Sequence, residues 1–475
     1  MRTLARRLLL PGLTALALTT AGCSSPAPVN AAGPGSPAAL PSASDGTRRL
    51  DVDAAPQGAA APSPIARTRA GQGPEKAPLK VASYDKASGR AVISAAPQGG
   101  GASPHRSAAP SKGPSAGSSD PAAKPVAVGD VIASAPAPGA PDGLLAKVTE
   151  VVGKTDRGTE VKTAPTTLAA ALGDDKADGK VPVDPASVVV EPLMKGVTFS
   201  WAKGSGVTFG PQGAKLPLGN LRLDVDAAVD TAKDAPASAG ASVAGFVQLA
   251  PQVEFSYDGG KGAGHGPDAA FLGMSGDWSS QWTLKGRAAA STGAPRRIPF
   301  AKLHSNPVLQ VGPVPVVVNL ELTCYVQVEA DGKVTLDVRQ DVKGDFRVGG
   351  SYATGKGWTP VSSSAVHSTP VKATVTAGGR VRSALGAEAS VGLYGAVGVT
   401  ADFAPYLRGE ADASASAATD GKTSANGSWA LYGGFDLSGQ LQLQLSVFGT
   451  PVVERRVPLG ALHREWPLVS GRAGQ

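Results

Sequence analysis

Acidic residues on candidate strands are the side chains with which this chain could most readily catalyse a reaction. Glu321, Glu329 and Asp337 share the polar parity of the apolar–polar alternation that begins at Leu320. Two carboxylates held about 5–10 Å apart in a groove are sufficient for glycoside hydrolysis. Acidic residues also cover the solvent face of most sheets. The pattern therefore leaves both interpretations open and assigns no catalytic residue.

Tryptophan side chains could bind a ligand by stacking. Trp358 follows the glycine-containing residues 355–357, so we expect it in a loop, where it could stack on a ligand or cap the end of a sheet. Trp278 and Trp282 share the parity of apolar neighbours, which favours packing in the core. Trp358 is the single aromatic residue that we propose for ligand binding.

The other motifs that could carry chemistry are incomplete. Lys356 lies in Gly350–Gly357, which lacks the hydroxyl residue and the following helix of a phosphate-binding loop, so we expect a hairpin turn there. Asp174–Gly179 is acidic but lacks the ligand spacing of a calcium loop, which favours a solvated loop. No metal-ligand spacing relates the histidines, which are His105, His265, His304, His367 and His463. We expect neither a metal site nor a cofactor.

Charge is distributed unevenly along the chain. The formal net charge is +7 at pH 7, and the basic excess lies before residue 127, beginning with Arg2, Arg6 and Arg7. Residues 127–475 are therefore close to neutral. A nucleic-acid-binding domain needs a clustered basic face, so we expect no nucleic-acid partner. The basic residues near the N-terminus suit an anionic membrane or cell wall instead.

The N-terminus has the features of a targeting segment. The three early arginines precede an apolar run, Leu8–Leu18, which is too short to span a bilayer. Ala21-Gly22-Cys23 follows, and the whole resembles a bacterial lipoprotein signal peptide, although Thr20 stands where such peptides usually have leucine. The resemblance implies that residues 1–22 are removed and that Cys23 carries a lipid. It also implies a location on the outer face of the bacterial cell membrane, reached by the general secretory or the twin-arginine route.

Residues 23–76 read as a disordered tether, because Ala, Pro, Gly and Ser dominate and large apolar residues are few. The chain has two cysteines, Cys23 and Cys324. If Cys23 is lipidated, no intramolecular disulfide can form. Cys324 has the inward parity of its apolar neighbours, so we expect it to be a small buried side chain rather than a nucleophile.

Residues 77–185 are predicted to form a small β-rich module with a disordered insertion at 98–124. Two strand-like runs surround Asp85–Gly89 as a hairpin, and Thr166–Leu172 is a helix candidate. The string "VGDVIAS…PDGLLAKVTEV…VKTAPTTLAAAL" is similar to a module of long secreted bacterial β-proteins whose biochemistry is unassigned. That resemblance implies no catalytic residue.

Residues 186–470 alternate apolar and polar side chains repeatedly, which predicts antiparallel strands with one buried face. Asp331-Gly332 is a hairpin signal, and Asn426-Gly427 is a second candidate turn. The prolines in Val311–Val318 predict an edge strand or an entry segment leading to Leu320. We therefore predict an all-β chain with a large antiparallel sandwich or stacked-sheet domain and a flexible tail at 471–475.

Three classes of function are compatible with these features. The first is a non-enzymatic envelope protein, binding or structural, whose partners are the membrane through Cys23 and a cell-wall polymer or envelope protein. The second is a hydrolase that acts on carbohydrate or cell wall with paired carboxylates. The third is a pore-forming or membrane β-barrel protein, because alternating strands such as 387–403 could face lipid, although aromatic residues are only 5% of the chain.

Overall fold

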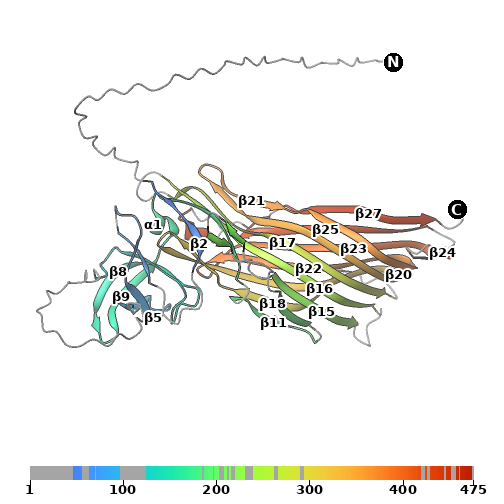
Figure 1. Ribbon diagram of the computed structural model, residues 1–475, viewed down its shortest axis with the longest axis horizontal. Helices are drawn as coiled ribbons and strands as arrows, with labels where there is room; N and C mark the ends of the chain where they lie inside the picture. Colours follow the sequence, from blue (N-terminus) through green and yellow to red (C-terminus); the bar gives the residue numbers. More distant parts are fainter. Residues whose placement is uncertain are drawn as a thin grey trace, which may run out of the picture. The chain divides into compact units, whose positions relative to one another are not determined.

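The computed structural model describes most of the chain beyond residue 46 (Figure 1). The described residues are 47–55, 64–69, 71–96, 125–184, 187–195, 197–202, 208–210, 213–215, 220–230, 239–260, 266–288, 294–418, 423–424, 428–442, 445–450, 456–458 and 460–472. The predictions for the signal peptide, Cys23, the insertion at 98–124 and the turn at Asn426-Gly427 lie outside these residues.

A seven-stranded sheet forms the smaller β-structure, in the order β4-β3-β7-β8-β9-β6-β5. Its strands are β3 (Ala66–Thr68), β4 (Glu75–Lys76), β5 (Leu79–Asp85), β6 (Arg90–Ala95), β7 (Val131–Ser134), β8 (Leu144–Thr155) and β9 (Gly158–Pro165). The hairpin predicted around Asp85–Gly89 is confirmed by the pairing of Asp85 with Arg90. The predicted helix is also confirmed as α1 (Leu168–Leu172), which Thr167 caps through its side-chain oxygen.

Ordered structure begins earlier than the composition predicts. Strands β1 (Arg49–Leu50) and β2 (Val52–Ala54) pair with the larger sheet, and β3 and β4 belong to the smaller one. These residues therefore belong to the two sheets, whereas the prediction for 23–76 places them in a tether. Similarly, β10 (Lys176–Pro182) pairs with the larger sheet rather than with the module. Short strands gain their backbone partners from an existing sheet, so local composition does not reveal them.

The larger sheet contains most of the remaining strands (Figure 1). They are β11 (Val189–Pro192), β12 (Val197–Ala202), β15 (Asn220–Asp230), β16 (Ala239–Gly259), β17 (Pro267–Ala288), β18 (Arg296–Ser305), β19 (Val308–Val311), β20 (Val314–Ala353), β21 (Gly357–Ser363), β22 (Val366–Leu393), β23 (Ala396–Ala418), β24 (Thr423–Ser424), β25 (Ser428–Gln442), β26 (Arg456–Pro458) and β27 (Leu462–Arg472). A separate pair, β13 (Thr208–Gly210) and β14 (Gly213–Lys215), and the 3-10 turn η2 (Leu445–Phe448) complete the described elements. Gly471 and Arg472, predicted to be tail, end β27.

Strand β20 bends back on itself, which turns the sheet into two facing layers. Its register places Cys324 opposite Ala387 and Gly344 opposite Trp278, and Ala387 lies opposite Phe403. The rings of Trp278 and Phe403 are only 5.5 Å apart between centroids. A straight strand would separate Cys324 from Gly344 by about 66 Å. The two halves of β20 must therefore lie on opposite sides of one core.

The corner of β20 replaces the hairpin predicted at Asp331-Gly332. Both residues lie inside the strand and pair with β22, where Gly332 is opposite Gly379. The chain changes direction with Gly332 at φ +88°, a backbone conformation that glycine adopts without strain. A two-residue loop does not form because β22 pairs with β20 on both sides of the corner.

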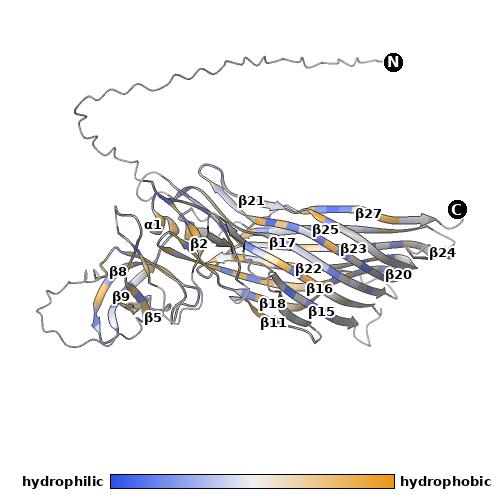
Figure 2. Cartoon of the chain, viewed as in Figure 1, coloured by the Kyte–Doolittle hydropathy of each residue, from blue (hydrophilic) through white to orange (hydrophobic). Residues whose placement is uncertain are grey.

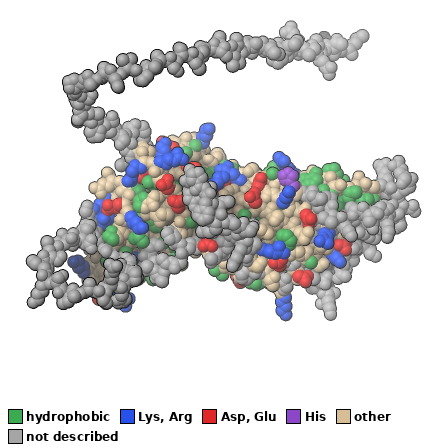
Figure 3. Space-filling model, in the orientation of Figure 1, with side chains coloured by type: hydrophobic (Ala, Val, Ile, Leu, Met, Phe, Trp, Pro, Cys, Tyr) green, Lys and Arg blue, Asp and Glu red, His purple; other side chains and the backbone are tan. Residues whose placement is uncertain are grey.

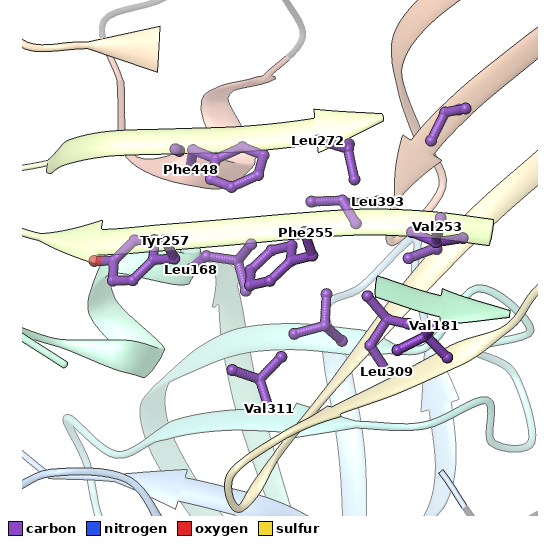
Figure 4. Close-up of a cluster of buried hydrophobic side chains, with 14 of the residues drawn as sticks. Leu168, Val181, Val253, Phe255, Tyr257, Leu272, Leu309, Val311, Leu393 and Phe448 are labelled. Carbon is purple, nitrogen blue, oxygen red and sulfur yellow. The ribbon is translucent and has the colours of Figure 1, made fainter. Parts of the chain in front are cut away.

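The apolar side chains of the two layers face each other, as the alternation predicts. Figure 2 shows apolar and polar residues alternating along the long strands. Near α1 and η2, a large cluster packs Leu168 of the helix and Phe448 with Phe255 and Leu272 of the sheet (Figure 4). The valines that begin β20 are buried and pair with β19, so the predicted entry segment is the first part of the strand that contains Leu320. The all-β fold class with antiparallel, sandwich-like packing is confirmed.

Candidate functional site

A cavity of about 150 Å³ lies between the two layers of the larger sheet. Side chains from β16, β17, β18, β20, β22, β23 and β25 line it, and nearly all of them are apolar. The lining includes Leu249, Met274, Trp278, Cys324, Ala389 and Phe403. A protein interior is normally packed without such gaps, so this space is the leading candidate for a binding site.

Small inward residues on two neighbouring strands create the space. Ala389 of β22 lies directly opposite Ala401 of β23, and Ala387 is one inward position further along β22. All three line the cavity. Each of these alanines contributes only a methyl group. A gap therefore remains between them and the larger side chains of the facing layer, such as Met274. The cavity therefore follows from the sequence of β22 and β23.

The interior of the cavity is almost without polar groups. His304 and Glu321 are among its lining residues, but both are exposed, while the strand neighbours Leu303 and Leu320 are buried. Strand alternation thus turns the charged side chains away from the interior. Ser305 faces inward, and its hydroxyl is already bonded to that of Ser187 at 2.7 Å. The lining can hold an apolar molecule, and it supplies no charged group for chemistry.

The buried cysteine belongs to this lining. Cys324 is a free, buried thiol, as the alternation predicts. Burial raises its pKa to about 12, so the nucleophilic thiolate is rare near neutral pH. Trp278 is also buried in the core, as expected, while the side chain of Trp282 lies outside the description. Cys324 therefore acts as part of an apolar wall rather than as a nucleophile.

Trp358 does not belong to the cavity. It is the second residue of β21 and pairs with Tyr352 of β20, so it lies in a strand and not in the loop that we expected. The turn of this β20–β21 hairpin includes Lys356, which confirms the hairpin predicted there. Its indole N–H donates to the Thr450 hydroxyl at 3.2 Å, and its ring packs edge-on against Phe448 at 5.3 Å. These contacts are typical of a tryptophan that covers the end of a sheet. They favour packing over the ligand stacking that we considered for Trp358.

The three acidic residues of β20 are not brought together. Glu321 and Glu329 are eight residues apart on one extended segment, which separates them by about 26 Å. Asp337 lies beyond the corner, in the facing layer. Glu321 lies 4.0 Å from Lys302, and Asp337 lies 3.6 Å from Lys285. This arrangement does not supply the carboxylate pair that a glycosidase needs.

A polar cluster on the outer face of β23, β25 and β27 was not visible in the sequence. His463 Nδ1 lies 2.6 Å from Asp436 Oδ1, and its Nε2 is 3.5 Å from the Tyr406 hydroxyl. Tyr406 donates to Glu465 at 2.9 Å, and Arg408 donates two hydrogen bonds to the same carboxylate. These bonds from Arg408 lower the pKa of Glu465, against a smaller opposing effect of burial. Among the described residues, this group of His463, Asp436 and Tyr406 most resembles the hydrogen-bonded groups that transfer protons in acid–base catalysis.

The cluster is one part of a repeated arrangement that neutralises its own charges. An arginine covers a tyrosine ring in each of three pairs, Arg297–Tyr325, Arg382–Tyr406 and Arg408–Tyr432. Each tyrosine hydroxyl also donates to a carboxylate, namely Asp402, Glu465 or Glu410. Such stacked cation–π pairs stabilise a sheet face. Figure 3 shows acidic and basic side chains interspersed on the visible face rather than separated by sign.

A buried carboxylate on β16 is paired with two cationic side chains. Glu254 accepts a hydrogen bond from Arg347 Nε at 2.8 Å and lies 2.7 Å from Lys180 Nζ. Burial favours the neutral acid and so acts to raise its pKa. Hydrogen bonds from Lys180, Ser275 and Arg347 together outweigh that effect and lower the pKa. The ionised carboxylate of Glu254 on β16 therefore links this strand to β10 and β20 through its two ion pairs.

Two further properties concern metals and membranes. Among the described residues, no three His, Cys, Asp or Glu side chains are grouped as metal ligands. In the same part of the chain, the helices lack the length and apolar character needed to cross a bilayer.

Comparison with known proteins adds no relative. No protein-family model, no curated protein and no solved structure matches this chain.

Proposed function

We propose that this chain is a lipid-anchored, extracytoplasmic envelope protein that binds an apolar molecule between the two layers of its larger sheet and catalyses no reaction. The cavity is the observation that carries the proposal. It combines an apolar lining with an interior free of charged side chains, which is the composition of a binding site rather than of a catalytic one.

The physical driving force for binding is the hydrophobic effect. An apolar cavity of about 150 Å³ stays dry in other proteins and takes up small apolar molecules such as benzene. Transfer of an apolar ligand from water into such a space is favourable because the ligand loses contact with water while the protein gains packing contacts. Leu249, Met274 and Phe403 offer those contacts from three different strands.

The expected location supports an apolar ligand. With Cys23 lipidated, residues 24–48 would link the anchor to the first strand. In any conformation, a segment of this length spans at most about 90 Å. The binding domain would thus stay near a bilayer, which is the main reservoir of apolar molecules at that location.

The proposal is tested with 1-decanol as a neutral apolar probe and the full chain carrying Cys23→Ser. Calorimetry should show saturable binding to one site per chain. At 100 times the dissociation constant, the unfolding free energy should rise by about 2.7 kcal/mol. The intrinsic fluorescence should change with the same dissociation constant, since Trp278 lies in the lining.

Two tryptophan variants give the position of the probe. Trp278→Phe should remove most of the fluorescence change while calorimetry still detects binding. Trp466→Phe is the matched control, because Trp466 is partly buried on β27 and outside the cavity lining, and it should leave the change intact. If decanol binding is unsaturable, or if Trp466 rather than Trp278 reports it, the proposal is wrong.

A further inference from the structure

We infer that the ligand of this cavity is one unbranched acyl chain of a single-chain lipid, held in an extended conformation with its head group outside the protein. The inference rests on the proposed function, since it specifies the class of apolar molecule that the cavity takes. Three properties of the lining lead to it: its length along the strands, its small cross-section and the position of its charges.

The length of the cavity matches an acyl chain. The lining runs from Met274 to Ser280 on β17 and from Val342 to Val348 on β20. Six residues of extended strand span about 20 Å. On β22 the lining from Leu385 to Ala389 spans about 13 Å. One leaflet of a bilayer core is about 15 Å thick, which is the length that a lipid acyl chain occupies there.

The cross-section is too small for a bulky molecule. A volume of about 150 Å³ distributed over this length leaves a slender channel rather than a round chamber. Facing sheets lie about 10 Å apart, and side chains such as Phe403 and Met274 occupy most of that distance. One chain of methylene groups fits such a channel, whereas fused rings or two parallel chains do not.

The charges place the head group outside. The exposed His304 and Glu321 lie on the edge of the lining with their side chains turned outward, and Lys302 lies 4.0 Å from Glu321. Glu321 would repel an anionic head group, and Lys302 would repel a cationic one. Neither sign of charge is therefore favoured at this position. The binding energy must therefore come from the chain, and a neutral head isolates that contribution.

The test is a series of neutral 1-alkanols from six to sixteen carbons, measured by calorimetry with the full chain carrying Cys23→Ser. Each added methylene should tighten binding about fourfold, which is the ratio expected when a methylene is fully buried. The gain should stop at the length that fills the channel. A fused-ring alcohol and a diacylglycerol should bind at least tenfold more weakly than the best alkanol.

The source of the chain is tested in the same experiment. A fatty acid and a monoacylglycerol of the best length should bind within about tenfold of the alkanol, because the head is not recognised. If alkanols bind but affinity does not depend on length, or if the fused-ring alcohol binds best, the acyl-chain inference fails and the proposed function stands. If no apolar probe binds at all, both fail.

Discussion

Blocking the cavity with a single side chain should abolish ligand binding without unfolding the protein. Ala389 of β22 lines the cavity opposite Ala401. Ala389→Phe adds a phenyl ring at this position. The ring lies across the channel between the two layers, so a ligand chain cannot pass Ala389 and the carbons beyond this point lose their place in the cavity.

The magnitude follows from the number of carbons displaced. A phenyl ring excludes about six ligand carbons, and each buried methylene is worth about 0.8 kcal/mol. The loss is about 5 kcal/mol, which is more than a thousandfold in the dissociation constant. Stability should respond differently, because the ring enters existing space. We expect the free energy of unfolding to change by less than about 1 kcal/mol, whereas overpacking a filled core would cost about 1–3 kcal/mol.

The assay combines decanol calorimetry with urea unfolding of the full chain carrying Cys23→Ser. Ser390→Phe is the matched control, since Ser390 is the next residue of β22 and its side chain points to the other face of the sheet. It should bind decanol as the parent does. Undiminished decanol binding by Ala389→Phe, or a loss of more than 2 kcal/mol of stability in that variant, would refute the reasoning.

Three further predictions concern other residues. Labelling with a palmitate analogue should mark the wild-type chain and not Cys23→Ser; an unlabelled wild type contradicts the anchor. Because the pKa of Cys324 is about 12, a polar disulfide reagent at pH 8 should modify it only after unfolding, and rapid modification of the native chain contradicts its burial. Glu254→Gln should lower the unfolding free energy by about 2–3 kcal/mol at pH 7, because Lys180 and Arg347 lose their partner. The folded pKa of Glu254 is lowered, so its contribution is complete above the unfolded pKa, near 4.3, and is lost as pH falls through the folded value. The difference between parent and variant should therefore shrink below pH 4, and a constant difference contradicts the assignment.

Local patterns in the sequence predicted much of the secondary structure. The alternation around Leu320 identified the strand, its inward face and the burial of Cys324, because side chains of a strand alternate with period two whatever the partner strand is. The hairpin around Asp85–Gly89 and the helix capped by Thr167 were also predictable, since their signals lie within a few residues.

The failures involve partners far away in the sequence. Asp331-Gly332 looks like a two-residue hairpin, but β22 pairs with β20 across it and makes a corner instead. Residues 49–54 look like tether, but β10 and β19 provide them with backbone partners. Register between distant strands depends on the whole sheet, so no local window contains it.

The same division applies to function. By itself the sequence determined an all-β chain and a near-neutral C-terminal region, because these depend on composition and period along the chain. The lipid anchor at Cys23 stays a prediction from the sequence. Only the tertiary structure decided that the acidic residues of β20 stay apart and that Ala389 and Ala401 meet beneath larger facing side chains. A cavity is a property of the space between layers, and that space exists only once β20 has folded back.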